Sequence, residues 1–358
     1  MILEIILKSV AVLVILGTMM PLVRCDYWLV RAWDFPRLQL FVLGLGVMPF
    51  LWRGSMAGGA DAWDIVIIAG LGLALVALAV QMIRYTPLFP KEVLRSDGES
   101  GIKIIISNVL MTNRKSDRLL KLVREYRPDL FVTLEVDEWW AREIATLDDI
   151  FPHGVNVPLD NTYGMIMRSR LPLIDPRVEY LVHDDIPSIH ADLELSDGSL
   201  VHLHAVHPKP PFPDEAESAL DRDAELLVVG KRAEQHGGPT IVLGDLNDVA
   251  WSRTTRLFQK ISRLLDPRIG RGFYSTFHAK HWFMRWPLDH VFISDHFRVR
   301  TVKRLPFIES DHFPIYVDFS FEPEEKDEQE APDADHDDHK EAAATIQESE
   351  EKNGRDIS

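Results

Sequence analysis

An apolar run near the N-terminus limits what this chain can fold into more than any other feature. Residues 65–83 (IVIIAGLGLALVALAVQMI) contain no charged side chain. A helix of this length crosses the roughly 30 Å hydrocarbon core of a bilayer. The sequence therefore predicts a membrane-spanning helix at this position.

Two further apolar segments precede this run. Residues 9–23 are not followed by a small-residue cleavage site, so we interpret them as an uncleaved anchor rather than a signal peptide. Residues 38–52 contain Pro49 and are interpreted as a third span or as an interfacial segment. Together the three segments predict a membrane anchor over residues 1–95 of an integral, multi-pass membrane protein, located in the inner membrane if the source is bacterial.

Basic residues indicate the orientation of this anchor. With three spans, the loop between the first two segments and the stretch after the third lie on the same side. That side carries Arg24, Arg31, Arg37, Arg84, Lys91 and Arg95, whereas the opposite loop has only Arg53. The excess of basic residues favours a cytoplasmic location for this side and for the domain that follows. An interfacial second segment would reverse the assignment.

From residue 101 the pattern changes to short β-rich runs that alternate with amphipathic stretches. This pattern predicts a layered α/β domain over residues 101–320. Strands are expected at 103–109, 130–135, 163–168, 189–195, 200–206, 240–243, 290–293 and 314–319. Helices are expected at 116–126, 137–146, 215–235 and 252–264.

The net charge of -16 is concentrated at the C-terminus. Residues 321–358 hold four basic and fifteen acidic side chains and few aromatics, which predicts an acidic, disordered tail. Residues 101–320 carry a charge of only -5 and lack the basic excess of proteins that bind nucleic acid through its phosphates. Cys25 is the only cysteine, so no disulfide scaffold is present.

Polar residues of a few types recur at the ends of the predicted strands, where open α/β sheets gather their sites. They are Asn108 in SNVL, Glu135 in VTLEVD, His207 in HAVHPKPP, Asp245 and Asn247 in GDLN, Asp289 in PLDHVFIS, and Asp311 and His312 in SDHFPI. Hydrolysis of a phosphate ester needs a hard cation, a directed water molecule and donor groups around the phosphoryl oxygens. Carboxylates, amides and histidines supply these functions.

In this order the motifs resemble those of the endonuclease/exonuclease/phosphatase superfamily, which includes exonuclease III and DNase I type nucleases, neutral sphingomyelinases and inositol polyphosphate 5-phosphatases. The resemblance covers residues 101–320. It implies an α/β fold, an α+β four-layer sandwich in which two packed β-sheets are flanked by helices, here in a membrane-anchored, bacterial-type member with N-terminal transmembrane helices. It also implies hydrolysis of a phosphodiester or phosphomonoester by in-line attack of water.

The motifs assign a role to each residue. Glu135 is the expected ligand of Mg²⁺ or Mn²⁺, which prefer oxygen, and Asn108 and Asp311 complete the coordination directly or through water. Asp245 is suited to orient or deprotonate the attacking water. Asn247 then fixes Asp245 or the phosphate through its amide.

Three further residues complete the expected catalytic set. His312 faces the phosphate, and Asp289 accepts a hydrogen bond from its other ring nitrogen, as is usual in the family that the motifs resemble. His207 contacts another phosphoryl oxygen or assists the leaving group. Strand alternation places His202 and His204 on the opposite face, so a structural role is expected for both.

The sequence leaves the substrate open among lipids, inositol phosphates and nucleic acids. The membrane anchor and the aromatic run from Phe273 to Trp286 favour a lipid or membrane-proximal phosphate ester. One alternative is a membrane-tethered endonuclease or exonuclease acting on DNA or RNA, which would require a basic groove; Arg271, Lys280 and Arg285 are the only local basic density. A second alternative is a catalytically silent binding scaffold. The sequence carries no signal for an oligomer.

Overall fold

The computed structural model describes residues 2–59 and 61–357, which form two compact units. The first unit comprises Met1–Phe89 together with Pro211–Ala219, and the second comprises Pro90–Pro210 and Leu220–Ser358. This division differs from the predicted boundaries in two ways. A loop from the middle of the chain belongs to the first unit, and the acidic C-terminal segment belongs to the second.

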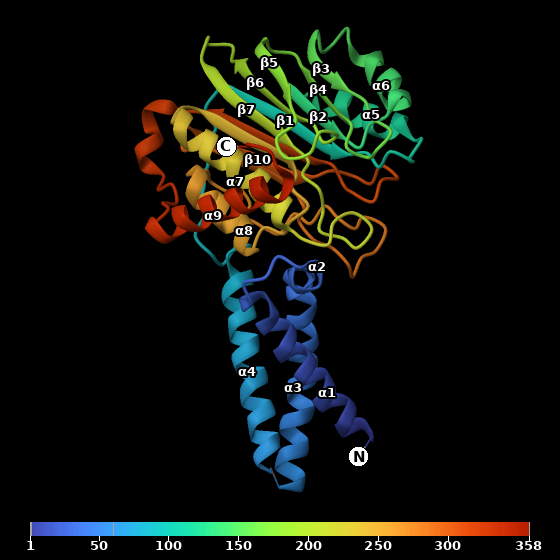
Figure 1. Cartoon of the computed structure of the whole chain (residues 1–358), viewed down its shortest axis with the longest axis vertical. Coiled ribbons are helices and arrows are strands. Elements are labelled where there is room, and N and C mark those ends of the chain that lie inside the picture. Colours follow the sequence, from blue (N-terminus) through green and yellow to red (C-terminus); the bar gives the residue numbers. More distant parts are fainter. Residues whose placement is uncertain (1, 60, 358) are drawn as a thin grey trace. The chain divides into compact units, whose positions relative to one another are not determined.

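The first unit contains three long helices that run alongside one another (Figure 1). They are α1 (Ile2–Met19), α3 (Arg37–Gly58) and α4 (Ala62–Ile83). By length and composition, Ile2–Leu22, Arg37–Ala57 and Ala62–Ile83 can each cross a membrane. The short helices η1 (Met20–Leu22), α2 (Trp28–Arg31) and η2 (Ala32–Asp34) connect α1 to α3.

Small residues allow the three helices to pack closely. A Cβ atom at Gly44 of α3 would lie 2.9 Å from the side chain of Leu75 in α4 and 3.3 Å from that of Val14 in α1. Glycine at helix interfaces lets backbones approach in this way. Gly44 therefore contributes to helix packing, which is the role that its apolar surroundings indicate.

Charged groups lie at the two ends of the helix bundle. At one end Lys8 forms an ion pair with Asp64 at 2.5 Å. At the other end Arg37 pairs with Asp34 at 2.8 Å and donates to the side chain of Gln81. The long apolar stretches between these ends are the part that a hydrocarbon layer would cover.

The second unit is built on two mixed β-sheets. The six-stranded sheet has the order β10-β11-β1-β2-β4-β3, and the five-stranded sheet has the order β5-β6-β7-β8-β9. The strands are β1 (Gly101–Asn108), β2 (Leu130–Leu134), β3 (His153–Val157), β4 (Met165–Ser169), β5 (Leu173–Glu179), β6 (Ser188–Glu194), β7 (Leu200–Val206), β8 (Thr240–Asp245), β9 (Asp289–Ile293), β10 (Phe297–Arg304) and β11 (Ile315–Phe321).

Three of these strands, β3, β5 and β10, are absent from the sequence prediction. They lie at sheet edges, where each strand pairs with only one neighbouring strand of its sheet. The middle of β5 is exposed on both faces, so it lacks the alternation of apolar and polar residues that identifies a half-buried strand. β10 in turn pairs with β11 through a register shift between Val299 and Thr301.

Five helices complete the second unit: α5 (Ser116–Tyr126), α6 (Glu138–Ile144), α7 (Leu220–His236), α8 (Arg253–Ser262) and α9 (His336–Asn353); the short helices η3 (Ala145–Leu147) and η4 (Pro323–Glu328) accompany them. Asp137 and Ser252 cap α6 and α8 through their side chains. α7 begins later than predicted, because residues 211–219 belong to the first unit. There the backbones of Glu217 and Ala219 form hydrogen bonds with those of Trp28 and Asp26.

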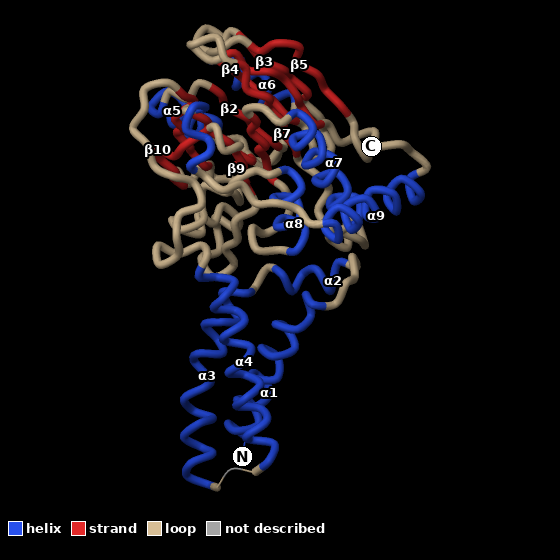
Figure 2. Tube along the Cα trace, turned by 90° about the vertical axis from the view of Figure 1, so that its left-hand side faces the viewer, coloured by secondary structure: helices blue, strands red, loops and turns tan. Residues whose placement is uncertain are grey.

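Three apolar clusters define the layers of the second unit. The largest lies between the two sheets and includes Ile104 and Val132 from one sheet and Leu203 and Leu243 from the other. A second cluster lies between the six-stranded sheet and helices α5 and α6. A third joins the five-stranded sheet to α7, α8 and α9, which gather on one side of it (Figure 2). The fold is therefore the predicted four-layer α/β sandwich.

The C-terminal segment differs from the predicted disordered tail. It forms η4 and then α9, which starts with a capping box between Asp335 and Asp338. Ala342 and Ile346, one helical turn apart, are buried against α7 and α8. Acidic side chains of the segment pair with basic ones, as Asp338 does with Lys260 at 2.7 Å. The average composition hides this short apolar stripe, which is why the segment resembles a solvated charge run.

Candidate active site

The predicted site residues gather where the strands of both sheets end. β1 runs parallel to β2, and β7 runs parallel to β8, so the carboxyl ends of each pair meet at one edge. Asn108 ends β1 and Glu135 follows β2 in one sheet. His207 follows β7 and Asp245 ends β8 in the other. The start of the antiparallel strand β9 brings a fifth residue there, because Asp289 pairs with Asp245 in the ladder.

Asn108 connects the two sheets through its amide. Its Nδ2 donates to Glu135 Oε1 at 2.7 Å and to Asp245 Oδ2 at 3.1 Å. Its Oδ1 accepts from the backbone N–H of Leu110 at 3.1 Å. Asn108 was predicted as a metal ligand, and the structure places its amide nitrogen between two carboxylates. In this arrangement the Asn108 side chain bridges Glu135 and Asp245.

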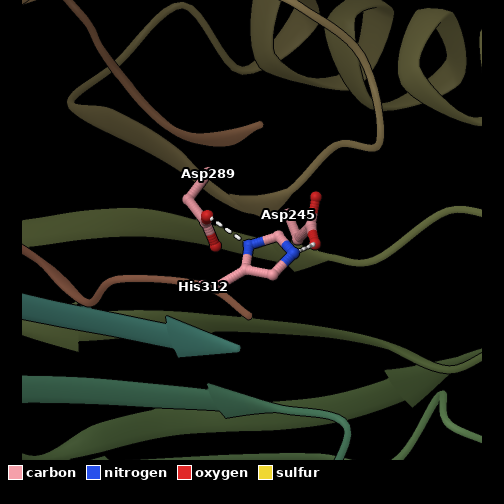
Figure 3. Close-up of side chains that lie close together, drawn as sticks. All are labelled: Asp245, Asp289 and His312. Atoms are coloured by element: carbon pink, nitrogen blue, oxygen red, sulfur yellow. Dashed lines mark hydrogen bonds and ion pairs between the residues drawn. The ribbon is translucent and has the colours of Figure 1, made fainter. Parts of the chain in front are cut away.

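The imidazole of His312 lies between two aspartates (Figure 3). Its Nδ1 is 2.7 Å from Asp289 Oδ2, and its Nε2 is 3.5 Å from Asp245 Oδ2. Because a carboxylate can only accept, Nδ1 carries the proton and donates to Asp289. This is the predicted pairing of His312 with Asp289, and it leaves Nε2 facing Asp245.

Electrostatics keep His312 protonated. Burial disfavours its charged form, but the carboxylates of Asp289 and Asp245 outweigh burial and raise its pKa to about 10. Burial also raises the pKa of Asp289, which the charge of His312 partly offsets. Asp289 is further fixed by its backbone N–H, which donates to Thr276 Oγ1 at 3.2 Å. The cluster thus holds a buried positive charge at a defined place.

Glu135 is held in a left-handed backbone conformation directly after β2, with φ at +59°. Such conformations are costly for residues other than glycine and occur often at functional sites. Burial raises the pKa of Glu135 to about 7; the hydrogen bond from Asn108 lowers it, and nearby Asp311 and Asp245 raise it further.

The charges of this cluster suit a divalent cation. Glu135, Asp245, Asp289 and Asp311 bring carboxylates to a site where His312 supplies the opposing charge. Asp245, Asp289 and His312 form a group of possible metal-binding side chains whose ligand atoms lie within 4.8 Å of one another. His312 already donates to Asp289, and the carboxylate oxygens of the cluster are the ligand type that Mg²⁺ or Mn²⁺ prefers.

The G-D-L-N motif forms a tight turn that aims Asp245. A Cβ atom at Gly244, where φ is +146°, would lie 1.9 Å from the carbonyl oxygen of Val206, so glycine is required there. The backbone N–H of Asn247 donates to Asp245 Oδ1 at 3.0 Å. The side chain of Asn247 instead donates to the carbonyl oxygen of Pro208 at 3.0 Å. Asn247 therefore orients Asp245 through its backbone and holds the loop after His207 through its amide.

His207 approaches the same oxygen of Asp245 as His312 does. Its Nε2 is 3.9 Å from Asp245 Oδ2, and its ring centre is 5.4 Å from that of Tyr163. The structure therefore brings His207 to the cluster, as expected, and places Tyr163 beside it. Tyr163 is buried, which explains why a packed strand residue and a site residue are hard to distinguish from sequence.

Several positioning residues escape the sequence analysis. Arg222 of α7 is buried and donates to the carbonyl oxygen of Asn247 at 2.8 Å. Asp248 is buried beneath the same turn and accepts from Thr255 Oγ1 at 3.1 Å. Ser310 donates to the carbonyl oxygen of Asn108 at 2.8 Å and accepts from the backbone N–H of His312 at 3.0 Å. Of these residues, only Ser310 is part of a motif that assigned site residues, because it is the serine of S-D-H.

Comparisons with known proteins agree with this fold. The chain resembles an endonuclease/exonuclease/phosphatase from Beutenbergia cavernae, with 18% identity, 63% of this chain and 72% of that chain covered, and a TM-score of 0.51. It also resembles D. rerio TDP2 complexed with a single-strand DNA product (14% identity, 62% and 100% covered, TM-score 0.50) and the human Nocturnin catalytic domain (18%, 65% and 97%, TM-score 0.50). No curated protein matches the chain.

The sequence profile of one family matches residues 106–312, which is more than half of the chain and contains every predicted site residue. Members of this family are hydrolases that act on phosphate esters. The chain belongs to the Endonuclease/Exonuclease/phosphatase family.

Proposed function

We propose that this chain is a membrane-anchored, Mg²⁺- or Mn²⁺-dependent phosphoesterase whose substrate is an amphiphilic phosphate ester. The observation that carries the proposal is the strand-end cluster, in which protonated His312 lies between Asp289 and Asp245 while Asn108 joins Asp245 to Glu135. A positive imidazole, an oriented carboxylate and oxygen ligands for a hard cation are the groups that phosphate-ester hydrolysis needs.

Each residue then has a defined task. Glu135 and Asp311 hold the metal ion, which supplies Lewis-acid stabilisation of the phosphoryl oxygens when bound. Asp245, fixed by Asn108 and by the backbone of Asn247, orients the attacking water or accepts its proton. His312 places its positive charge against a phosphoryl oxygen, and Asp289 maintains that charge. His207 contacts the opposite side of the phosphate.

An exposed aromatic loop beside the site supports the choice of an amphiphilic substrate. Phe277 has its ring centre 5.0 Å from that of His312, and the backbone N–H of Ala279 donates to the carbonyl oxygen of Asp311 at 2.6 Å. Further along this loop Trp282 is 79% exposed and Phe283 is 54% exposed. Large exposed aromatic side chains next to a site mark contact with apolar material.

Of the three basic residues near this loop, Lys280 is exposed, whereas Arg271 and Arg285 are engaged within the protein. Arg271 is half-buried and donates to the backbone carbonyl of Val93 at 2.6 Å. The guanidinium of Arg285 lies over the ring of Phe313 at 5.2 Å. Both side chains are thus engaged within the protein, whereas nucleic-acid binding needs cations that face the phosphate backbone. This observation favours an amphiphilic ester over DNA or RNA.

We infer that the catalytic unit faces the cytoplasm. Arg37 at the start of α3 contacts Gln81 near the end of α4, so the α1–α3 loop and the residues after α4 share one end of the bundle. That end carries the larger number of basic residues, which favours the cytoplasmic side. The sole cysteine, Cys25, lies in this loop and provides a native probe.

The substrate is tested with the purified full-length chain in detergent micelles with Mg²⁺. Release of the headgroup from vesicles that contain sphingomyelin or phosphoinositides is compared with hydrolysis of soluble inositol phosphates, single-stranded DNA and duplex DNA. We expect cleavage of the vesicle substrate, and loss of activity with chelator and in Asp245→Asn. Cleavage of DNA alone would overturn the proposed substrate class, and a folded protein inert on every ester would favour a binding scaffold.

The aromatic loop is tested by the double change Trp282→Ser and Phe283→Ser. We expect kcat/KM on the vesicle substrate to fall by about tenfold or more, because burial of such side chains contributes roughly 1.5–3 kcal/mol. Hydrolysis of a soluble ester by the same variant provides the control and is expected to be unchanged. An equal loss on both substrates would show that the loop supports the site rather than the substrate surface.

Orientation is tested by labelling Cys25 with a membrane-impermeant maleimide. We expect labelling only after the cells are permeabilised. The variant Cys25→Ser with Ser55→Cys moves the probe into the last turns of α3, near the opposite end of the bundle, and is expected to show the reverse pattern. Labelling of Cys25 in intact cells would place the catalytic unit outside.

A further inference from the structure

A second polar cavity lies on the outer face of the five-stranded sheet, distinct from the strand-end cluster. It has a volume of about 500 Å³, and strands β5, β6 and β7 and the C-terminal end of α7 form its walls. Four histidines line it: His190, His202, His204 and His236. We name this group the histidine pocket. The proposed phosphoesterase mechanism uses none of these side chains.

Strand register brings the members of the histidine pocket together. In the β6–β7 ladder His190 is opposite His204, and Asp192 is opposite His202. Alternation along each strand puts all four on the same face, away from the apolar cluster between the sheets. Their ring centres are 4.8 Å apart for His190 and His204, and 4.5 Å apart for His202 and His204. His236 of α7 stacks on His202, with 4.5 Å between ring centres.

The hydrogen bonds fix which ring nitrogen of His204 lacks a proton. Ser188 Oγ lies 3.2 Å from the carbonyl oxygen of Glu179, to which it can only donate. Its single proton is then used, so His190 Nε2, at 2.8 Å from Ser188 Oγ, must donate to it. His190 Nδ1 therefore accepts, and His204 Nδ1, at 2.6 Å, donates to it. The remaining nitrogen, His204 Nε2, carries a lone pair.

This lone pair is buried and has no hydrogen-bond partner among the described residues. His204 is 1% exposed, and its ring lines the cavity. A buried acceptor without a donor is costly, so this nitrogen calls for a partner, which is either an ordered water or a bound ion. A proton is disfavoured as that partner, because burial lowers the pKa of His204 well below its ordinary value.

His202 is oriented in the way that metal-binding histidines are. Its Nδ1 lies 2.6 Å from Asp192 Oδ1, so Nδ1–H donates to the carboxylate and Nε2 is left as a ligand. Carboxylate partners of this kind are common behind histidines that bind metal. His236 is exposed at the end of α7 and stacks on His202 at an interplanar angle of 20°, so its ring must rotate to direct a nitrogen to the same ion.

The charges of the cavity favour a cation over an anion. Arg232 pairs with Glu179 at 2.6 Å, and Arg177 pairs with Asp175 at 3.0 Å, so both cations are already matched by carboxylates. Burial lowers the pKa of His190 to about 4, which keeps its imidazole neutral at pH 7. Neutral imidazoles beside a carboxylate suit Zn²⁺ and related transition metals, whereas Mg²⁺ prefers oxygen.

We propose that the histidine pocket is a binding site for a divalent transition-metal ion of the Zn²⁺ class, held by His202, His204 and His236 with Asp192 behind His202. A bound ion ties the C-terminal end of α7 to β7. The same helix holds the carbonyl of Asn247 through Arg222, so the ion stabilises a helix that supports the strand-end cluster. The site takes a different metal class from that cluster.

The test measures Zn²⁺ binding by the full-length protein in detergent micelles, purified without a polyhistidine tag, by competition with a chromogenic chelator. Saturating Mg²⁺ is present throughout to occupy the strand-end cluster. We expect one Zn²⁺ per chain to remain bound in Mg²⁺, and to be lost in the double variant His202→Gln with His204→Gln. Asp192→Asn is expected to weaken binding by roughly 10- to 100-fold, as changes behind a ligand do.

Matched variants separate this site from other histidines. His236→Gln changes an exposed side chain, so it tests the pocket even where the buried double variant fails to fold, and we expect at least tenfold weaker binding. His312→Gln and His153→Gln, which alter histidines elsewhere in the unit, are expected to retain the ion. Three results would each overturn the proposal. The wild type binds no Zn²⁺, His236→Gln binds it at full affinity, or His312→Gln loses it.

Discussion

The second unit contains two groups of histidines whose buried members have opposite electrostatic properties. At the strand ends, the carboxylates of Asp289 and Asp245 overcome burial and raise the pKa of His312 to about 10. In the histidine pocket, burial lowers the pKa of His190 to about 4 and that of His204 well below its ordinary value. The imidazole side chain thus favours its cationic form in one place and its neutral form in the other, and its neighbours decide which.

Backbone geometry differs between these regions as well. Glu135 and Asn247 at the strand ends have positive φ angles, which irregular loops impose. The histidine pocket lies on the regular ladder between β6 and β7. Backbone strain at the strand ends is typical of a functional site. Along the β6–β7 ladder the outer face of the five-stranded sheet has regular backbone geometry, and this face packs against helices. Changes in the first region should therefore alter rates, and changes in the second should alter stability or metal binding.

The largest expected effect is on the rate. His312→Gln removes the buried charge that faces the phosphate, and we expect kcat to fall by roughly 10²–10⁴-fold, the range for a lost acid–base or charge-stabilising side chain. The thermal unfolding temperature should fall as well, because the change leaves Asp289 and Asp245 buried without their cationic partner, so kcat is compared per folded molecule. Hydrolysis assays and circular dichroism on the same sample check both expectations. If the variant is destabilised but its folded fraction keeps the wild-type kcat, then His312 serves stability rather than the reaction rate, which is the opposite of what we expect.

A smaller effect is expected from the α9 packing. Ile346→Ala removes a buried side chain from the cluster with α7 and α8, and we expect a loss of about 2–5 kcal/mol in the free energy of unfolding. The kcat per folded molecule should stay the same. Glu348→Ala, on the exposed face of α9, is the matched control and should leave stability unchanged. Equal stabilities of the two variants would mean that α9 does not pack in solution.

The smallest expected effect concerns pH. Burial raises the pKa of Glu225 on α7 from its ordinary value of 4.5 to about 8. The unfolded chain therefore ionises first, and wild-type stability falls as pH rises from about 4.5 to about 8. Glu225→Gln has no carboxyl group to ionise, so it does not show this loss. Its free energy of unfolding should match that of the wild type near pH 4 and exceed it by about 1–3 kcal/mol at pH 8. Chemical denaturation at both pH values measures the difference, and a pH-independent difference would contradict the assignment.

Much of the strand-end cluster could be predicted from the sequence because its residues follow apolar strands in a fixed order. G-D-L-N identified Asp245, and S-D-H identified His312, since each motif stands directly beside a buried strand. The details that depend on side-chain direction could not be predicted. Asn108 turns its amide nitrogen to both carboxylates, and Asn247 uses its side chain on Pro208.

Other features depend on contacts between distant segments and leave no local signal. The strand β5 is exposed along most of its length, and the acidic segment folds as α9 only because α7 and α8 present an apolar surface to Ile346. The histidine pocket is of this kind too. Alternation alone placed His202 and His204 on the outer face, but only the β6–β7 register brings His190 and Asp192 beside them.

The central claim is that the strand-end cluster hydrolyses phosphate esters with a hard cation on Glu135. The most direct test is the dependence of the hydrolysis rate on Mg²⁺ concentration for the full-length wild type and for Glu135→Gln. We predict a saturable dependence that chelator abolishes, and for Glu135→Gln a lower rate that needs more Mg²⁺ to saturate. A rate that neither chelator nor Glu135→Gln affects would contradict the account.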